Sequence, residues 1–299
     1  MADIGTSILA RLKNKAKESK ISYQQCLQLF FQEEFLRRIS KSPYVNNLIL
    51  KGGLFIYTLT NFQSRATVDI DFMVQRLDNY PERLDEVIAE IISVPTGLNE
   101  TVILEAGKCV PIATHREYSG LSSQITGKIK KVRVPFNIDI GAGDIIVPKP
   151  ERRKIQTQLE GYDPPKIYTY SLESTIAEKF DAILQRFELT GRMKDFYDIF
   201  YLAQTFDFDG QRLGKALKKT LQNRKTEYDK ESFDRVLQLA DDNDIQARWQ
   251  YFQKTVNQTG LSLSEVMHLI DKFLHPVFVS LVLGEDLSKR WDAGHRKWE

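Results

Sequence analysis

Two aspartates, Asp69 and Asp71, interrupt an otherwise apolar run at residues 67–74, and this feature constrains the chain more than any other. The run alternates as a strand does, so both carboxylates would project from one face, about 7 Å apart by strand rise. Such a pair repels itself and resists burial, so we expect a compensating cation. Mg²⁺ suits it, because this ion takes one or two carboxylates together with substrate phosphates. Taken alone, an Asp-x-Asp strand is more often structural than catalytic.

A Gly-Gly pair, Gly52 and Gly53, precedes the aspartates. It follows a short apolar run at 47–50 and opens a helical stretch from Leu54 to about Asn61. Without Cβ atoms, the backbone N–H groups of this pair can approach a ligand, and the start of a helix favours phosphate. A Gly-Gly pair by itself usually marks a turn, so its meaning depends on its place before the aspartates.

A third carboxylate, Asp139, lies between isoleucines in the strand expected at 132–140. Pro135 indicates an edge or a bulge at the beginning of that strand. The order of strand, Gly-Gly, short helix, Asp-x-Asp strand and later Asp139 strand resembles the polymerase-β-like nucleotidyltransferase superfamily. In that superfamily three carboxylates hold two metal ions, which activate an attacking hydroxyl and stabilise the departing pyrophosphate. The resemblance therefore implies that Asp69, Asp71 and Asp139 bind Mg²⁺.

Two blocks in the second half narrow the resemblance. An Ala-Glu-Lys helix contains Lys179, and an Arg-x-Lys-Asp-x-x-Asp helix begins at Arg192. With the Gly-Gly and Asp-x-Asp segments, these blocks resemble the AbiEii/AbiGii toxin family over roughly residues 48–203. The resemblance implies the toxin of a toxin–antitoxin or phage-defence pair, with a cognate antitoxin as partner. It also implies an enzyme with two Mg²⁺ ions and an NTP substrate that adds nucleotides to an RNA acceptor, with the 3′ end of tRNA expected.

The resemblance also assigns site residues. The catalytic residues would be Asp69, Asp71, Asp139, Lys179, Asp195 and Asp198. The nucleotide-binding residues would be Gly52, Gly53, Arg65, Lys179 and Lys194, with Lys179 contacting the triphosphate. From spacing alone, residues 192–198 fit equally a surface ion-pair network, in which Lys194 pairs with Asp198. Lys179 likewise fits a lysine at the edge of the core, and we interpret Tyr197 as a core residue.

The chain is long for one core, so two lobes are expected. We predict an α/β (α+β) nucleotidyltransferase lobe with a mixed sheet at 1–170. An α-helical lobe at 171–299 would complete the nucleotide and RNA cleft. Ser22 with Gln25 and Ser262 with Glu265 form capping boxes that start helices, and Ser42-Pro43 ends the first of them. Further helices are expected at 82–93, 172–189, 192–204, 210–224, 230–256 (broken) and 262–283 (interrupted before Pro276).

Composition narrows the setting. No apolar run approaches the roughly 18 residues that a membrane span needs, and the amino-terminal residues do not resemble a secretory signal. The two cysteines, Cys26 and Cys109, lack a CxxC spacing, which favours buried reduced thiols in a cytoplasmic protein. Net charge is only +2, yet basic clusters at 128–133, 149–154, 215–225 and 289–297 suggest a polyanion-binding surface.

Three other functions fit parts of the pattern. A nucleotidyltransferase could act on a small-molecule or protein hydroxyl, although the basic clusters favour RNA. A non-catalytic binding protein could keep the fold, but retention of all three acidic positions and Lys179 argues against it. A metal-dependent nuclease would also cluster acids, but the Gly-Gly segment better suits a triphosphate.

Overall fold

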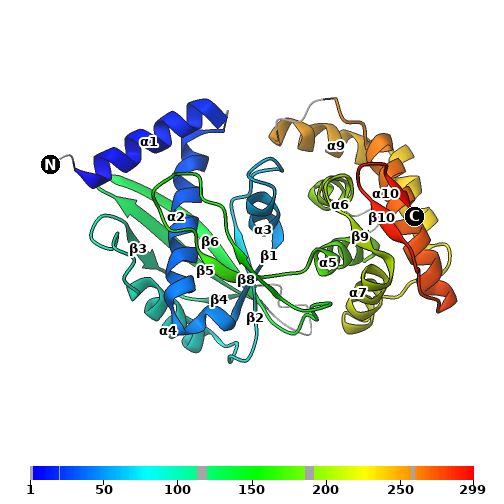
Figure 1. Ribbon diagram of the computed structural model, residues 1–299, viewed down its shortest axis with the longest axis horizontal. Helices are drawn as coiled ribbons and strands as arrows, with labels where there is room; N and C mark the ends of the chain where they lie inside the picture. Colours follow the sequence, from blue (N-terminus) through cyan, green and yellow to red (C-terminus); the bar gives the residue numbers. More distant parts are fainter. Residues whose placement is uncertain (1–2, 20, 113–119, 186–191, 257–259) are drawn as a thin grey trace. The chain divides into compact units, whose positions relative to one another are not determined.

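The computed structural model describes residues 3–19, 21–112, 120–185, 192–256 and 260–299 (Figure 1). The chain divides into two compact units. The first comprises Met1–Gly143 and Pro150–Tyr170, and the second comprises Asp144–Lys149 and Ser171–Glu299. Residues 144–149 thus belong to the second unit, although they precede the boundary expected near residue 170.

A mixed sheet, as predicted, forms the first unit. In the described residues it has eight strands in the order β3-β5-β6-β2-β1-β8-β7, with β4 paired to β5. The strands are β1 (Leu48–Lys51), β2 (Ile70–Val74), β3 (Ile103–Ala106), β4 (Val110–Ile112), β5 (Gly120–Ile129), β6 (Val132–Gly141), β7 (Glu151–Lys154) and β8 (Lys166–Thr169). Strand β2 lies parallel to β6 and antiparallel to β1, and β1 lies parallel to β8. The four neighbouring strands β6, β2, β1 and β8 therefore surround the Gly-Gly and Asp-x-Asp segments.

The helices of this unit are α1 (Ile4–Ser19), α2 (Tyr23–Lys41), α3 (Gly52–Leu59) and α4 (Pro81–Ser93), with a 3₁₀ turn, η1, at Pro43–Asn46. The capping box of Ser22 and Gln25 starts α2, and Ser42 ends it, as predicted. Helix α2 packs on the sheet through Phe35, whose ring lies 6.3 Å from that of Phe72. Because side chains alternate along β2, Asp71 projects from the opposite face.

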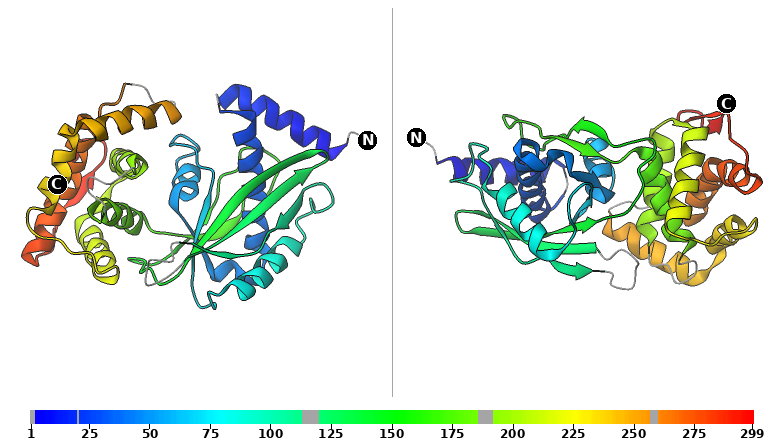
Figure 2. Two further views of the ribbon diagram at one scale, coloured as in Figure 1. Left: turned by 180° about the vertical axis from the view of Figure 1, so that it is seen from behind. Right: turned by 90° about the horizontal axis from the view of Figure 1, so that it is seen from below.

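The β5–β6 hairpin is regular throughout, and β2 pairs with β6 only from Ile138 onward. Pro135 pairs with Thr126 on β5, and at this position β6 has no partner on its other side among the described residues. The edge predicted from Pro135 is therefore confirmed, and no bulge is needed. The hairpin turn lies beside α1, where Lys130 pairs with Asp3 at 2.6 Å (Figure 2).

The second unit is mostly helical. It contains α5 (Leu172–Leu184), α6 (Met193–Thr205), α7 (Gly210–Asn223), α8 (Ser232–Gln238), a 3₁₀ turn η3 (Leu239–Asp241), α9 (Asn243–Thr255) and α10 (Leu263–Leu283). The break predicted within 230–256 is confirmed. The helix expected at 172–189 is present as α5, which ends at Leu184. Residues 186–189 lie outside the described part of the chain. A small sheet of β9 (Phe208–Asp209), β10 (Arg290–Asp292) and β11 (Lys297–Trp298) was not predicted.

Helix α10 corrects two expectations. It continues through Pro276 instead of stopping before it. Buried side chains on both sides of the proline, including Phe273 and Phe278, offset the hydrogen bond that proline removes. Among the described residues, α10 is also long and apolar enough to cross a membrane by length and composition. Its packing against α6 and α7 identifies it as a core helix.

Candidate functional site

The Gly-Gly turn lies directly against the first strand carboxylate. Gly52 follows β1, whose Lys51 is the register partner of Asp71. It has a φ of 69°, and a Cβ placed on it would lie 2.1 Å from Oδ2 of Asp71. Both facts require glycine, because a side chain would be strained at this φ and would also collide with the carboxylate.

Gly53 is restricted by the segment between α3 and β2. A Cβ on Gly53 would lie 2.8 Å from Oγ1 of Thr67 and 3.5 Å from Nη2 of Arg65. The guanidinium of Arg65 therefore lies beside the Gly-Gly turn. The structure brings together four of the predicted site residues here, namely Gly52, Gly53, Arg65 and Asp71.

Asp71 and Asp139 are register partners on the adjacent parallel strands β2 and β6. Their side chains share one face of the sheet, with strands about 4.8 Å apart. Both residues are half-buried, while Ile138 and Ile140 beside Asp139 are buried, as the apolar flanks predicted. The Ser122 hydroxyl donates a 2.6 Å hydrogen bond to Oδ1 of Asp139. Sequence reasoning missed Ser122, which only the pairing of β5 with β6 places there.

Asp69 differs from expectation, because β2 begins at Ile70 and not at Thr67. The carbonyl of Val68 accepts side-chain hydrogen bonds from Gln28 and Gln32 of α2, the second at 2.8 Å. Strand pairing therefore does not extend back to this carbonyl. Asp69 is half-buried and directly precedes the strand, so alternation alone does not place it on the face of Asp71.

The carboxylates suit a hard divalent cation. Oxygen donors on neighbouring strands, reachable from solvent and next to a turn with no side chains, match what Mg²⁺ and a phosphate need. The residues that could hold such an ion are Asp71 and Asp139, with Asp69 beside them.

Lys179, Asp195 and Asp198 form a buried cluster in the second unit. The ammonium of Lys179 lies 3.2 Å from Oδ1 of Asp195 and 2.5 Å from Oδ2 of Asp198. The side chains of both aspartates are 1 % exposed and that of Lys179 is 10 % exposed. Arg192 also pairs with Asp195. The cluster is therefore an internal ion-pair network, not the surface network that spacing alone allowed.

The charges in this cluster decide the titration of Asp195. Burial raises the pKa of Asp195, but the Lys179 charge and the hydrogen bond from Arg192 outweigh it and hold the pKa below its usual range. Asp195 is therefore held as a carboxylate. Lys194 lies on the exposed side of the same helix, and Tyr197 is buried against Phe252 and Tyr201, which confirms the core interpretation.

Comparison with known families decides the class of protein. The model of the family described as nucleotidyl transferase AbiEii toxin, type IV toxin–antitoxin system, matches residues 34–274. The chain belongs to the AbiEii nucleotidyltransferase toxin family. The protein is therefore a nucleotidyltransferase toxin of the type IV toxin–antitoxin class, and this class implies an antitoxin partner.

Two solved structures are similar to this chain. MenT4, a nucleotidyltransferase toxin from Mycobacterium tuberculosis H37Rv, is 15 % identical with a TM-score of 0.52, over 93 % of this chain and 99 % of that one. JHP933 from Helicobacter pylori is 16 % identical with a TM-score of 0.49, over 88 % and 99 % of the two chains. A search among curated proteins finds no match. At these identities the likeness to MenT4 shows the fold alone.

A second ion-pair cluster in this AbiEii toxin centres on Arg224. Its guanidinium contacts Asp144 at 2.9 Å, Asp181 at 3.0 Å and Glu178 at 3.2 Å. Burial lowers the pKa of Arg224, but these carboxylates outweigh it and raise the pKa. Sequence reasoning grouped Arg224 with the basic cluster at 215–225. The structure instead shows it binding residues 144–149 to α5, a contact between segments far apart in sequence.

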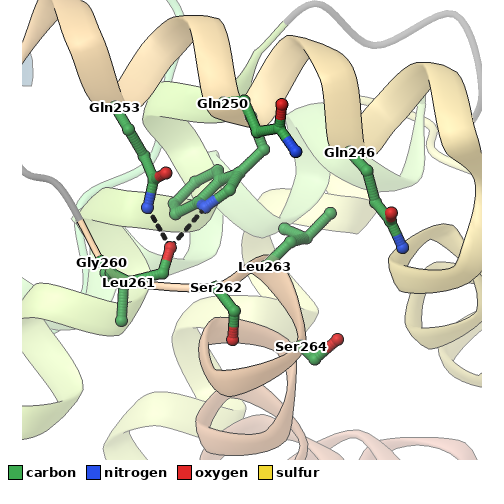
Figure 3. Close-up of a pocket in the computed structure, with 9 residues that line it drawn as sticks. Gln246, Gln250, Gln253, Gly260, Leu261, Ser262, Leu263 and Ser264 are labelled. Carbon is green, nitrogen blue, oxygen red and sulfur yellow. Dashed lines mark hydrogen bonds between the residues drawn. The ribbon is translucent and has the colours of Figure 1, made fainter.

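The second unit of this toxin also contains a cavity of about 330 Å³ between α9 and the start of α10 (Figure 3). Three glutamines line it, Gln246, Gln250 and Gln253, together with Trp249 and residues 260–264. The carbonyl of Leu261 accepts hydrogen bonds from the Trp249 indole, at 2.8 Å, and from the Gln253 amide. None of the predicted site residues lines this cavity.

Proposed function

We propose that this AbiEii toxin transfers nucleotides from an NTP to an RNA acceptor in the cytoplasm, with Mg²⁺ and with the 3′ end of tRNA as the expected acceptor, and so arrests growth. One observation carries the proposal. Asp71 and Asp139 are register partners on adjacent strands, and Gly52 lies so close to Asp71 that no other residue fits. This combination supports a site where carboxylates, a metal ion and a triphosphate meet.

In this proposal Asp69, Asp71 and Asp139 hold two Mg²⁺ ions. When bound, the ions supply activation of the acceptor hydroxyl and stabilisation of the departing pyrophosphate. Ser122 orients the Asp139 carboxylate through its hydrogen bond. The backbone N–H groups at Gly52 and Gly53 open α3 and are suited to phosphate oxygens.

The remaining predicted residues bind the nucleotide. Arg65, beside the Gly-Gly turn, and the exposed Lys194 supply positive charge for phosphates. Lys179 contacts the triphosphate through the small part of its side chain that reaches solvent, while Asp195 and Asp198 hold its ammonium in position.

A labelling experiment tests the proposal. The purified protein is incubated with Mg²⁺, total RNA and each of four labelled NTPs in turn, with EDTA in a parallel series. We expect label from one or more NTPs in RNA of tRNA size, and none with EDTA. Label in the protein itself or in a small molecule, with none in RNA, would contradict the RNA acceptor and favour the alternative acceptor hydroxyls.

A further inference from the structure

Strands β7 and β8 place like charges directly opposite each other. Lys154 on β7 is the register partner of Lys166 on β8, and Arg152 is the partner of Tyr168. Alternation along β7 puts Arg152 and Lys154 on one face, so all four side chains share it. The three cations are exposed and Tyr168 is half-buried. We call Arg152, Lys154, Lys166 and Tyr168 the β7–β8 patch.

The patch is unfavourable for folding by itself. Like charges directly opposite on neighbouring strands destabilise a sheet. Within the described ranges, none of the three cations forms an ion pair that relieves the repulsion. Arg153, between them in sequence, projects from the other face, where it pairs with Glu151 and lies 6.0 Å from the Phe55 ring. An external anion would compensate the three remaining charges.

Edge protection does not explain the patch. Lysines on an edge strand often prevent pairing with another chain, and β7 is such an edge. Lys166, however, lies on β8, which pairs with β1 and β7 on its two sides. Its charge faces away from the sheet and adds nothing to the defence of the edge. The pairing of Lys154 with Lys166 therefore points to a ligand.

The basic cluster of the β5–β6 hairpin differs. Lys128 pairs with Glu105, and Lys130 pairs with Asp3 and also donates to Thr6. These lysines already have anionic partners within the first unit. Lys128 also lies opposite a cation, Arg133, and neither Arg133 nor Lys131 forms an ion pair among the described residues. The β7–β8 patch has three such unpaired cations against two in the hairpin cluster, and it therefore has the larger uncompensated positive charge.

The patch lies on the same sheet face as the carboxylates. Asp71 is the partner of Lys51, Ile49 on the same strand is the partner of Tyr168, and Tyr168 is the partner of Arg152. Register partners on neighbouring strands share a face, and so do residues two apart on one strand, so all of these side chains lie on one face of the sheet. By strand spacing and rise, the patch begins roughly 12 Å from Asp71, at Tyr168, and extends to roughly 20 Å, at Lys154.

We propose that the β7–β8 patch binds the phosphate backbone of the single-stranded end of the RNA acceptor and guides it toward Asp71 and Asp139. The proposal rests on the proposed function. Cations that follow a backbone, with an aromatic ring beside them, are typical of single-strand binding. The expected acceptor, the 3′ end of tRNA, is single-stranded, and the patch is a few nucleotides from the carboxylates.

The test uses full-length Lys154→Gln, Lys166→Gln and the double variant. Binding to a single-stranded oligoribonucleotide and to purified tRNA is measured over a series of salt concentrations. We expect each substitution to weaken binding about threefold to tenfold at low salt and to lower the slope of log K against log salt by about 0.7. Lys130→Gln, which removes an exposed lysine held by Asp3, is the matched control and should change neither quantity.

Melting temperature provides an independent measurement. Because each substitution relieves repulsion, the variants should melt at or above the wild-type temperature while binding RNA more weakly. Unchanged RNA affinity and salt slope in the double variant would overturn the proposal that the β7–β8 patch binds RNA. Losses equal to those of Lys130→Gln would overturn it as well. Failure of the wild-type protein to bind RNA at all would instead contradict the RNA acceptor, so the two failures can be told apart.

Discussion

The acidic residues of the two units are in opposite environments. In the first unit, Asp71 and Asp139 face each other across neighbouring strands, half-buried, beside a glycine turn. In the second unit, Asp195 and Asp198 are almost fully buried and share the Lys179 ammonium. In the sequence, Asp69 with Asp71 and Asp195 with Asp198 look alike, as closely spaced carboxylates near basic residues.

This difference separates carboxylates that bind a ligand from carboxylates that stabilise the fold. Burying a carboxylate requires a counter-charge in the fold, and the second unit supplies it with Lys179 and Arg192. A carboxylate pair that solvent can reach, next to glycines whose missing side chains leave space, is placed to bind an external ligand. We therefore expect substitutions in the first group to remove activity and substitutions in the second to affect folding as well.

The largest expected effect is on transfer in Asp71→Asn. The variant keeps the shape of the side chain but loses the charge that would hold Mg²⁺, so transfer should fall on the order of a thousandfold. Stability should hold or rise, since repulsion with Asp139 is relieved. Transfer rates and thermal melting check both outcomes, and expression of the wild type but not of Asp71→Asn should arrest bacterial growth. Asp78→Asn, at an exposed aspartate, is the control, and near-native transfer in Asp71→Asn would refute the assignment.

Lys179→Ala tests the other side of the comparison. It would leave Asp195 and Asp198 buried without their shared cation, which costs about 3 to 5 kcal/mol of unfolding free energy. Chemical denaturation measures the loss.

A neutral triple variant separates folding from catalysis. Lys179→Met combined with Asp195→Asn and Asp198→Asn removes all three charges, so it should recover most of the stability. If transfer stays low in this variant, a role for the cluster in nucleotide transfer is supported. Recovery of transfer along with stability would make the cluster purely structural and would remove Lys179 from the nucleotide site.

Gly52→Ala should have an intermediate effect. A Cβ there meets the Asp71 carboxylate and also forces a side chain into a φ of 69°. Gly97→Ala is the matched control, because its φ is 84° but no atom lies within 4 Å of the added Cβ. Both variants should lose about 1 kcal/mol from the backbone, and only Gly52→Ala should also lose transfer, by roughly tenfold or more. Equal transfer in the two variants would mean that the close approach to Asp71 has no catalytic consequence.

Local signals in the sequence predicted much of the fold. Capping boxes at Ser22 and Ser262, the edge indicated by Pro135 and the break within 230–256 are all confirmed, because each depends on neighbouring residues. Two predictions were wrong, namely that the β2 strand starts at Thr67 and that the last long helix is interrupted before Pro276. Contacts from side chains of α2 decide the first, and the packing of α10 decides the second.

The site shows the same limit. Adjacency of Asp71 and Asp139 depends on the pairing of β2 with β6, and the Ser122 contact depends on β5. The partners of Lys179 depend on how α5 and α6 pack. The sequence was enough to identify the candidate site residues, but it was not enough to predict these long-range contacts.

The smallest expected effect concerns Glu33 in α2, a carboxyl buried in the first unit without the close ion pair that Asp195 has. Burial raises the pKa of Glu33 to about 8 from its ordinary 4.5, and the Gln158 N–H donates to it at 2.9 Å. Between these values the folded protein keeps a proton that the unfolded chain releases, so stability falls as pH rises through this window. Glu33→Gln accepts the same hydrogen bond without titrating, so its advantage over the wild type should grow by about 1 to 3 kcal/mol between pH 5 and pH 8. Denaturation at both pH values measures this, with Glu100→Gln at an exposed site as the control. Parallel pH profiles for wild type and Glu33→Gln would show that burial alone does not set the charge of this carboxyl, and would weaken the contrast with Asp195.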